Sequence, residues 1–170
     1  GNTIYGDIID MPTGSTTTGV TQYFNLTGIN TVSGHASDIS AHVSDFFLSG
    51  YNTLSGDTGD FPSTIKVLVV FGNNTLSGDI SNLPPNAWYI DLKGDNTIQD
   101  YTAGRSWAPN MNLLRILPSA SATTYLSTTE VDNLMNDLTG TTWSYSPRFG
   151  SPIIELVATA STASLAARNY

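Results

Sequence analysis

The sequence predicts a β-rich solenoid, in which short coils of the chain stack on one another and form a parallel sheet. Three observations lead to this prediction. The dipeptide Asn-Thr recurs every 22 residues, a short alternating apolar run precedes each copy, and no helical periodicity occurs between the copies. We therefore expect one strand per coil, followed by a tight return.

The repeat is anchored on an asparagine that recurs at Asn30, Asn52, Asn74 and Asn96. A fifth copy, Asn2-Thr3, lies 28 residues before Asn30, which indicates a six-residue insertion within residues 13–19. A glycine comes two residues before each of the four anchors, at Gly28, Gly50, Gly72 and Gly94. In stacked coils the Asn side chains can bond backbone groups and form an asparagine ladder. We expect these four residues to be structural.

The strands are predicted by the alternating runs Phe24-x-Leu26, Phe46-x-Leu48, Leu68-x-Val70 and Ile90-x-Leu92. Alternation is typical of a strand with one buried face. A single coil cannot bury that face alone, so neighbouring coils complete the core. Leu114-x-Ile116 predicts a fifth full strand, displaced by about two residues.

The C-terminal region predicts a helix that starts at Ser127 or Thr128, has Glu130 in its first turn, and stops at Gly140. Its apolar residues lie at helical spacing on one face: Val131, Leu134, Met135 and Leu138. We expect Met135 to fill the core rather than to bind a ligand.

A last strand, Ile153 to Val157, would then cover the open edge of the sheet together with this helix. The predicted organisation is a repeat region, residues 1–118, followed by a helix–strand cap, residues 119–170. Because the chain opens within a repeat and closes without a stop signal, we expect it to be part of a longer protein.

Composition excludes several classes of function. The formal net charge is −8, and no Lys or Arg occurs before Lys66. Binding to nucleic acid or to anionic lipid needs a basic surface, so neither is expected. Cysteine is absent, which excludes disulfides and thiolate chemistry. No apolar run approaches the roughly 20 residues that a membrane-spanning helix needs, so we expect no insertion by this segment.

The repeat resembles the leucine-rich-repeat family. The segment Leu68-x-Val70-x-x-x-Asn74-x-Leu76-Ser77-Gly78-Asp79-Ile80 is similar to the family pattern L-x-L-x-x-N-x-L-S-G-x-I-P. It departs from that pattern by one extra residue before the Asn and by a late proline, Pro84. The resemblance covers residues 1–118 and implies a leucine-rich-repeat architecture without naming a ligand.

Residues 126–156 resemble the closing unit of leucine-rich-repeat proteins from Bacteroidetes-type bacteria and their phages. In that family the unit caps the C-terminal end of the repeat array, both in surface proteins and in virion fibres. The resemblance therefore implies an extracellular location, on a virion or on a bacterial cell surface.

Candidate chemistry is sparse. The two histidines, His35 and His42, lack a convincing catalytic partner in the sequence. Asp57 and Asp79 are expected to stack at one coil spacing, where a cation such as calcium could bridge them. The alternative is that each Asp accepts backbone hydrogen bonds in its turn. Asp91 and Asp95 form a second, weaker candidate for a metal site. We expect no cofactor.

The outward half of each strand is the more informative surface, because it mixes aromatic side chains with small polar groups. The partner-binding candidates on it are Tyr23, Phe47, Tyr51, Phe71 and Tyr89. Aromatic side chains with polar tips suit recognition of proteins or sugars. The other possibility is that a neighbouring chain or domain covers these side chains.

The resulting hypothesis is a non-catalytic recognition or structural module of a phage virion fibre or tail protein, which binds a host-surface receptor. Its partner would be a cell-surface protein or glycan, or a neighbouring subunit of the appendage. The first alternative is the same module in a bacterial cell-surface adhesin. The second is a polysaccharide-active enzyme on a β-solenoid, since such folds can carry paired carboxylates.

Overall fold

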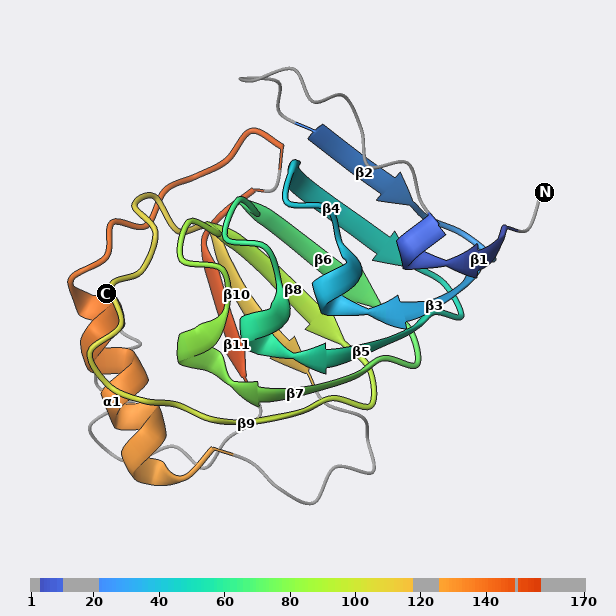
Figure 1. The fold of residues 1–170 in the computed structure, drawn as a ribbon. Helices are drawn as coiled ribbons and strands as arrows, with labels where there is room; N and C mark the ends of the chain where they lie inside the picture. Colours follow the sequence, from blue (N-terminus) through green and yellow to red (C-terminus); the bar gives the residue numbers. More distant parts are fainter. Residues whose placement is uncertain (1–3, 11–21, 118–125, 149, 157–170) are drawn as a thin grey trace.

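The computed structural model describes residues 4–10, 22–117, 126–148 and 150–156, and it consists of two parallel sheets and one α-helix (Figure 1). The six-stranded sheet has the order β11-β10-β8-β6-β4-β2. Its strands are β2 (Gln22–Leu26), β4 (Val43–Ser49), β6 (Val67–Phe71), β8 (Tyr89–Lys93), β10 (Leu113–Leu117) and β11 (Ile153–Leu156). The β-rich, parallel-sheet prediction is confirmed.

The five-stranded sheet has the order β1-β3-β5-β7-β9. Its strands are β1 (Tyr5–Asp7), β3 (Thr31–His35), β5 (Thr53–Asp57), β7 (Thr75–Asp79) and β9 (Thr97–Asp100). A short 3-10 turn follows each of the first four: η1 (Ile8–Asp10), η2 (Ala36–Asp38), η3 (Thr58–Asp60) and η4 (Ile80–Asn82). The strands of the two sheets thus alternate along the chain.

The prediction of one strand per repeat is therefore wrong, because each full repeat contributes one strand to each sheet. The missed strands have the sequence Thr-Leu-Ser-Gly-Asp in β5 and β7, with one fully buried side chain each, Leu54 and Leu76. A strand with only one buried residue shows no alternation from which it could be predicted. Its glycine also resembles a turn signal.

The glycine in these strands is required by packing and not by a turn, as Gly78 of β7 shows. A Cβ on Gly78 would collide with the carboxylate of Asp57 from the preceding repeat, and Gly78 has φ +104°. Only glycine combines this backbone conformation with such a close approach.

The strands of the six-stranded sheet pair with the 22-residue period, as in Phe46↔Leu68 and Leu68↔Ile90. The fifth predicted strand is β10, whose Leu114 pairs with Ile90 at the predicted two-residue displacement. Inward-facing side chains from both sheets form one apolar core. Its largest fully buried members include Phe46, Leu48, Leu54, Leu68, Leu76, Ile90, Leu92 and Leu114.

The helix α1 (Thr128–Thr139) has the predicted boundaries, with Ser127 as N-cap and Gly140 as C-cap. The Glu130 amide donates to Ser127 Oγ (3.3 Å) and the Ser127 amide donates to the Glu130 carboxylate (2.7 Å), a reciprocal capping box. Val131, Leu134 and Leu138 are buried, and Met135 packs partly buried against the core.

The last predicted strand corresponds to β11, which pairs in parallel with β10; Val157 lies outside the described residues. The proposed insertion within residues 13–19 also lies outside them. Within the described part of the chain, no helix combines the length and the apolar character needed to cross a membrane.

Candidate functional site

The outer face of the six-stranded sheet is formed by the side chains that alternate with the core positions of its strands. Cross-strand pairing arranges them in rows. One row is Tyr23, Asp45, Val67, Tyr89 and Leu113, the next is Asn25, Phe47, Val69, Asp91 and Arg115, and the third is Ser49, Phe71, Lys93 and Leu117. We call this surface the outer face.

Four of the five partner-binding candidates lie on the outer face. The Tyr23 side chain is 51% exposed, and Phe47, Phe71 and Tyr89 are half-buried. The rings of Tyr23 and Phe47 meet, with centroids 5.3 Å apart. Tyr51, 63% exposed, follows the end of β4 in a bend of the chain and is not part of the sheet surface.

The outer face also carries a cation that the sequence reasoning missed, Arg148. Its guanidinium lies 5.3 Å from the Tyr23 ring centroid and 5.0 Å from that of Phe47. One of its nitrogens is 3.5 Å from the carboxylate of Asp45. The sequence offered one signal for Arg148, which is the scarcity of basic residues. The chain has only six Lys and Arg in 170 residues, so each of them has many acidic or aromatic side chains to pair with.

A buried ion pair lies further along the same face. Asp91 is 2% exposed and accepts a hydrogen bond from Arg115 Nε at 2.8 Å, and Arg115 also lies 3.5 Å from Glu155. Hydrogen bonding to Asp91 raises the pKa of Arg115. Burial, together with the charge of Asp91, raises the pKa of Tyr89. The Asp91 carboxylate, a weak candidate for chemistry, thus has a cationic partner beside it.

Asp57 and Asp79 were expected to stack, but they are not direct cross-strand neighbours. In the five-stranded sheet Asp57 pairs with Ser77. The stagger differs from that of the six-stranded sheet, where residues 22 apart are paired. Each Asp instead caps the 3-10 turn that follows its own strand.

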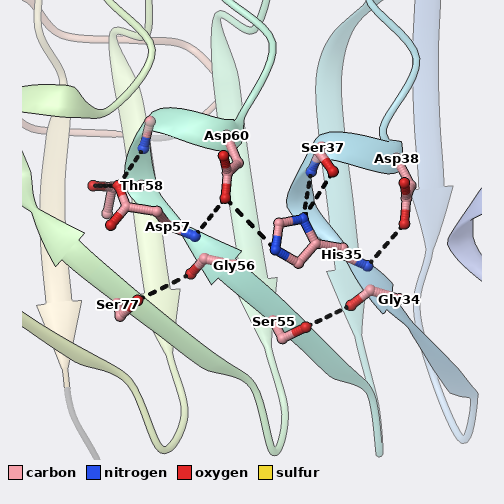
Figure 2. A network of polar contacts seen from close by, with 11 residues as sticks. Gly34, His35, Ser37, Asp38, Ser55, Gly56, Asp57, Thr58, Asp60 and Ser77 are labelled. Carbon is pink, nitrogen blue, oxygen red and sulfur yellow. Dashed lines mark hydrogen bonds and ion pairs between the residues drawn. The ribbon is translucent and has the colours of Figure 1, made fainter.

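Figure 2 shows the turn network around Asp57 and His35. Asp57 Oδ1 accepts from the Gly59 amide (2.9 Å), and the Asp57 amide donates to Asp60 (2.7 Å). His35 takes the same position one repeat earlier, where its Nδ1 accepts from the Ser37 amide (3.3 Å) and its Nε2 lies 3.6 Å from Asp60. These polar side chains satisfy backbone groups of the turns.

Asp79 accepts hydrogen bonds from the Ser81 amide (2.6 Å) and from the hydroxyl of Thr102 (2.6 Å). Burial opposes ionisation of Asp79, but these hydrogen bonds outweigh it and lower its pKa. Among the described residues, no cluster of three or more His, Cys, Asp or Glu side chains could hold a metal ion.

The four repeat asparagines are buried. Each lies in the short connection from a strand of the six-stranded sheet to the next strand of the five-stranded sheet. Asn52 Oδ1 accepts from the Val32 amide (3.2 Å), Asn74 Oδ1 from the Leu54 amide (3.0 Å) and Asn96 Oδ1 from the Leu76 amide (3.0 Å). Each of these three bonds joins the asparagine to the preceding repeat. Asn30 is buried at the start of the same series.

A polar joint connects the repeats to α1. Asp137 of the helix accepts from the Tyr101 hydroxyl (2.6 Å) and from the amides of Gly104 (2.7 Å) and Arg105 (3.2 Å). The Arg105 guanidinium lies 4.2 Å from the Trp107 ring centroid and donates to the carbonyl oxygens of four residues, Ile80, Ser81, Leu83 and Pro84. This joint binds the last regular repeat to the helix.

Acid is expected to weaken this joint. Burial opposes ionisation of Asp137, but the hydrogen bonds it accepts prevail and lower its pKa; hydrogen bonding from Ser127 lowers that of Glu130. A carboxylate with a lowered folded-state pKa stabilises fully above its unfolded pKa, roughly 4, and this contribution is lost as the pH falls through the folded-state value. We expect Tm to be steady between about pH 7 and about pH 5 and to fall below about pH 4.5.

The variant Asp137→Asn should show a shallower fall of Tm over the same acid range, because its amide does not titrate. Thermal unfolding followed by circular dichroism at each pH measures this. An unchanged slope in Asp137→Asn would show that Asp137 does not contribute to the acid dependence.

Comparison of the chain with protein-family models, with curated proteins and with solved structures finds no match.

Proposed function

We propose that this chain is a leucine-rich-repeat-type solenoid that acts as a non-catalytic recognition module and presents its outer face to a partner on a cell surface. One observation carries the proposal: Tyr23, Phe47, Phe71 and Tyr89 retain exposed area on a rigid parallel sheet. Partly exposed aromatic side chains on a rigid support suit recognition, since little conformational entropy is lost when they are covered.

The polar residues that could serve an enzyme have structural partners instead. Asp57 and Asp79 cap turns, and Asp91 pairs with Arg115. This arrangement favours the recognition module over the polysaccharide-active enzyme.

The proposed setting is a phage virion fibre or tail protein that binds a host-surface receptor, with a bacterial adhesin as the other setting of the same module. It is supported by the resemblance of residues 126–156 to the closing units of such proteins. Both settings use the outer face in the same way.

Replacing Phe71 with Ser is expected to weaken binding to a surface polysaccharide by about 10-fold or more, since central aromatic side chains carry much of the energy of an interface. Phe47→Ser should act in the same direction. Binding is measured on an array of bacterial surface polysaccharides, with Tm recorded for each variant. Tyr51→Ser is the matched control, because this aromatic side chain lies off the sheet and its loss should leave binding unchanged.

Equal binding by the native chain and Phe71→Ser, at equal Tm, would contradict the proposed face. Release of reducing ends from the same polysaccharides, lost in Asp57→Asn or Asp91→Asn, would contradict the non-catalytic assignment.

A further inference from the structure

The outer face contains a compact group of two aromatic rings and a carboxylate on its first two strands, which we call the ring pair site: Tyr23, Asp45 and Phe47. Tyr23 of β2 pairs directly with Asp45 of β4, and Phe47 lies two residues further along β4 on the same face. The two rings are 5.3 Å apart and inclined by 39°. The sheet register therefore holds all three side chains next to one another.

This combination of groups suits a guanidinium ion. The faces of aromatic rings attract cations within about 6 Å of the ring centroid. A planar guanidinium can stack on rings while its N–H groups donate to a carboxylate or a hydroxyl, which an ammonium ion does less well. The Tyr23 hydroxyl is itself held by a hydrogen bond from Asn25 Nδ2 (2.9 Å), which positions the ring.

Arg148 demonstrates this chemistry within the chain. Its guanidinium carbon lies over both rings, at 5.3 and 5.0 Å from their centroids. One terminal nitrogen donates to the Tyr23 hydroxyl (3.0 Å) and the other lies 3.5 Å from Asp45. The ring pair site thus has a guanidinium on it that comes from 125 residues away in the sequence.

Arg148 reaches the site from a short closed turn. Ser146 and Gly150 exchange backbone hydrogen bonds of 3.0 and 2.7 Å. Asn112 Nδ2 holds this turn by donating to the carbonyl oxygens of Ser144 and Gly150, both at 2.9 Å. The turn is fixed at its base, whereas the Arg148 side chain remains 48% exposed and meets Asp45 only at a long distance. An exposed side chain in such a contact can exchange with another of the same chemistry.

Charge complementarity favours a cation from outside the chain. The net charge is −8, and residues 1–65, which supply the three residues of the site, contain no Lys or Arg. An acidic surface attracts a basic partner over distance and accelerates its approach.

We propose that Tyr23, Asp45 and Phe47 form a binding site for an arginine side chain of a partner protein, and that Arg148 occupies this site in the isolated chain. The inference rests on the proposed function, recognition of a partner on a cell surface, and takes that partner to be a protein with an exposed arginine. When the partner binds, its arginine replaces Arg148 on the two rings.

The test uses the blocked tripeptide acetyl-Gly-Arg-Gly-amide, titrated into isotope-labelled protein and followed by the amide NMR signals of residues 23, 45 and 47. The variant Arg148→Ala is expected to bind it about 10-fold more tightly than the native chain, as follows if Arg148 occupies the site about nine-tenths of the time. The same peptide with citrulline, a neutral isostere of arginine, should not bind.

The matched variants are built on the emptied site. Adding Phe47→Leu or Asp45→Asn to Arg148→Ala should lower the affinity at least 10-fold, while Tm stays within a few degrees of that of Arg148→Ala alone. Equal affinity of the native chain and Arg148→Ala would overturn the proposal, as would equal binding of the citrulline peptide. A lower Tm in Arg148→Ala without any gain of binding would show that Arg148 is only a structural clasp.

The outcome separates this inference from the proposed function. If Arg148→Ala gains no arginine affinity while Phe71→Ser still loses polysaccharide binding, the recognition module stands and the arginine site fails. If the tripeptide binds as expected while no polysaccharide does, the arginine site stands and the partner is a protein.

Discussion

Replacing Asn74 with Ala is expected to lower the free energy of unfolding by about 3 kcal/mol, while replacing its neighbour Asn73 changes it by less than about 0.5 kcal/mol. Asn74 is fully buried; its Oδ1 accepts from the Leu54 amide (3.0 Å) and its Nδ2 donates to the Lys93 carbonyl (3.5 Å). Alanine leaves both backbone groups without this partner, and each unsatisfied buried group costs about 1–3 kcal/mol.

Asn73 is the control because it is the same residue type, one position earlier and exposed. Urea unfolding followed by circular dichroism measures both variants. Replacing Asn52 as well should destabilise the chain further, since Asn52 bridges to Val32 in the same way. Binding should follow stability in all these variants. A large loss of binding at unchanged Tm would contradict the structural role of the asparagines.

Gly72→Ala is expected to lower the free energy of unfolding by about 3–5 kcal/mol, and Gly28→Ala by only about 1–2 kcal/mol. Both glycines have φ in the region that side chains disfavour, +143° and +112°. A Cβ on Gly72 would lie 2.8 Å from the Gly50 carbonyl oxygen and 3.0 Å from the Asn52 amide nitrogen, whereas a Cβ on Gly28 would have nothing within 4 Å.

Both variants introduce backbone strain, because both glycines have a positive φ. The difference between their free energies of unfolding therefore measures the cost of the collision between successive turns at Gly72. Neighbouring backbone cannot move aside as a flexible side chain can, so the collision at Gly72 is costly. Equal destabilisation of the two variants in urea would show that strain alone requires glycine at this position.

The part of the fold that repeats was predictable. The runs around Phe46, Leu68 and Ile90 became adjacent parallel strands, because alternation reports the buried face and the constant period reports the register. The helix after Ser127 was predictable for a different reason: its capping box and its apolar spacing are both local signals.

The five-stranded sheet was not predictable in the same way. Leu54 and Leu76 are 22 residues apart and share the period, but a strand with one fully buried side chain shows no alternation of buried and exposed residues. Gly78 resembles a turn signal in the sequence, but in the structure a Cβ on it would collide with the Asp57 carboxylate. This close approach depends on the stagger between neighbouring strands, and the stagger is not encoded in any single repeat.

The candidate site divides along the same line. Tyr23 and Phe47 were identified as outward-facing aromatic residues from strand alternation alone. Their contact with Arg148 was missed, and so was the Arg115 partner of Asp91. Arg148 comes from outside the repeats, where no period relates one residue to another. Arg115 lies opposite Asp91 in the displaced register of the fifth strand, so this contact followed from the predicted pairing but was not drawn from it.

The sequence by itself therefore determined the 22-residue repeat, the parallel strands of the six-stranded sheet, the buried asparagines and the boundaries of the helix. Local patterns and a constant period suffice for these, because equivalent residues meet when identical units stack. Only the tertiary structure decided that each full repeat also contributes a strand to a second parallel sheet and that Arg148 lies on Tyr23 and Phe47. The contact of Arg148 with Tyr23 and Phe47 depends on how the chain folds back after the last repeat. That segment has no sequence period from which the contact could be predicted.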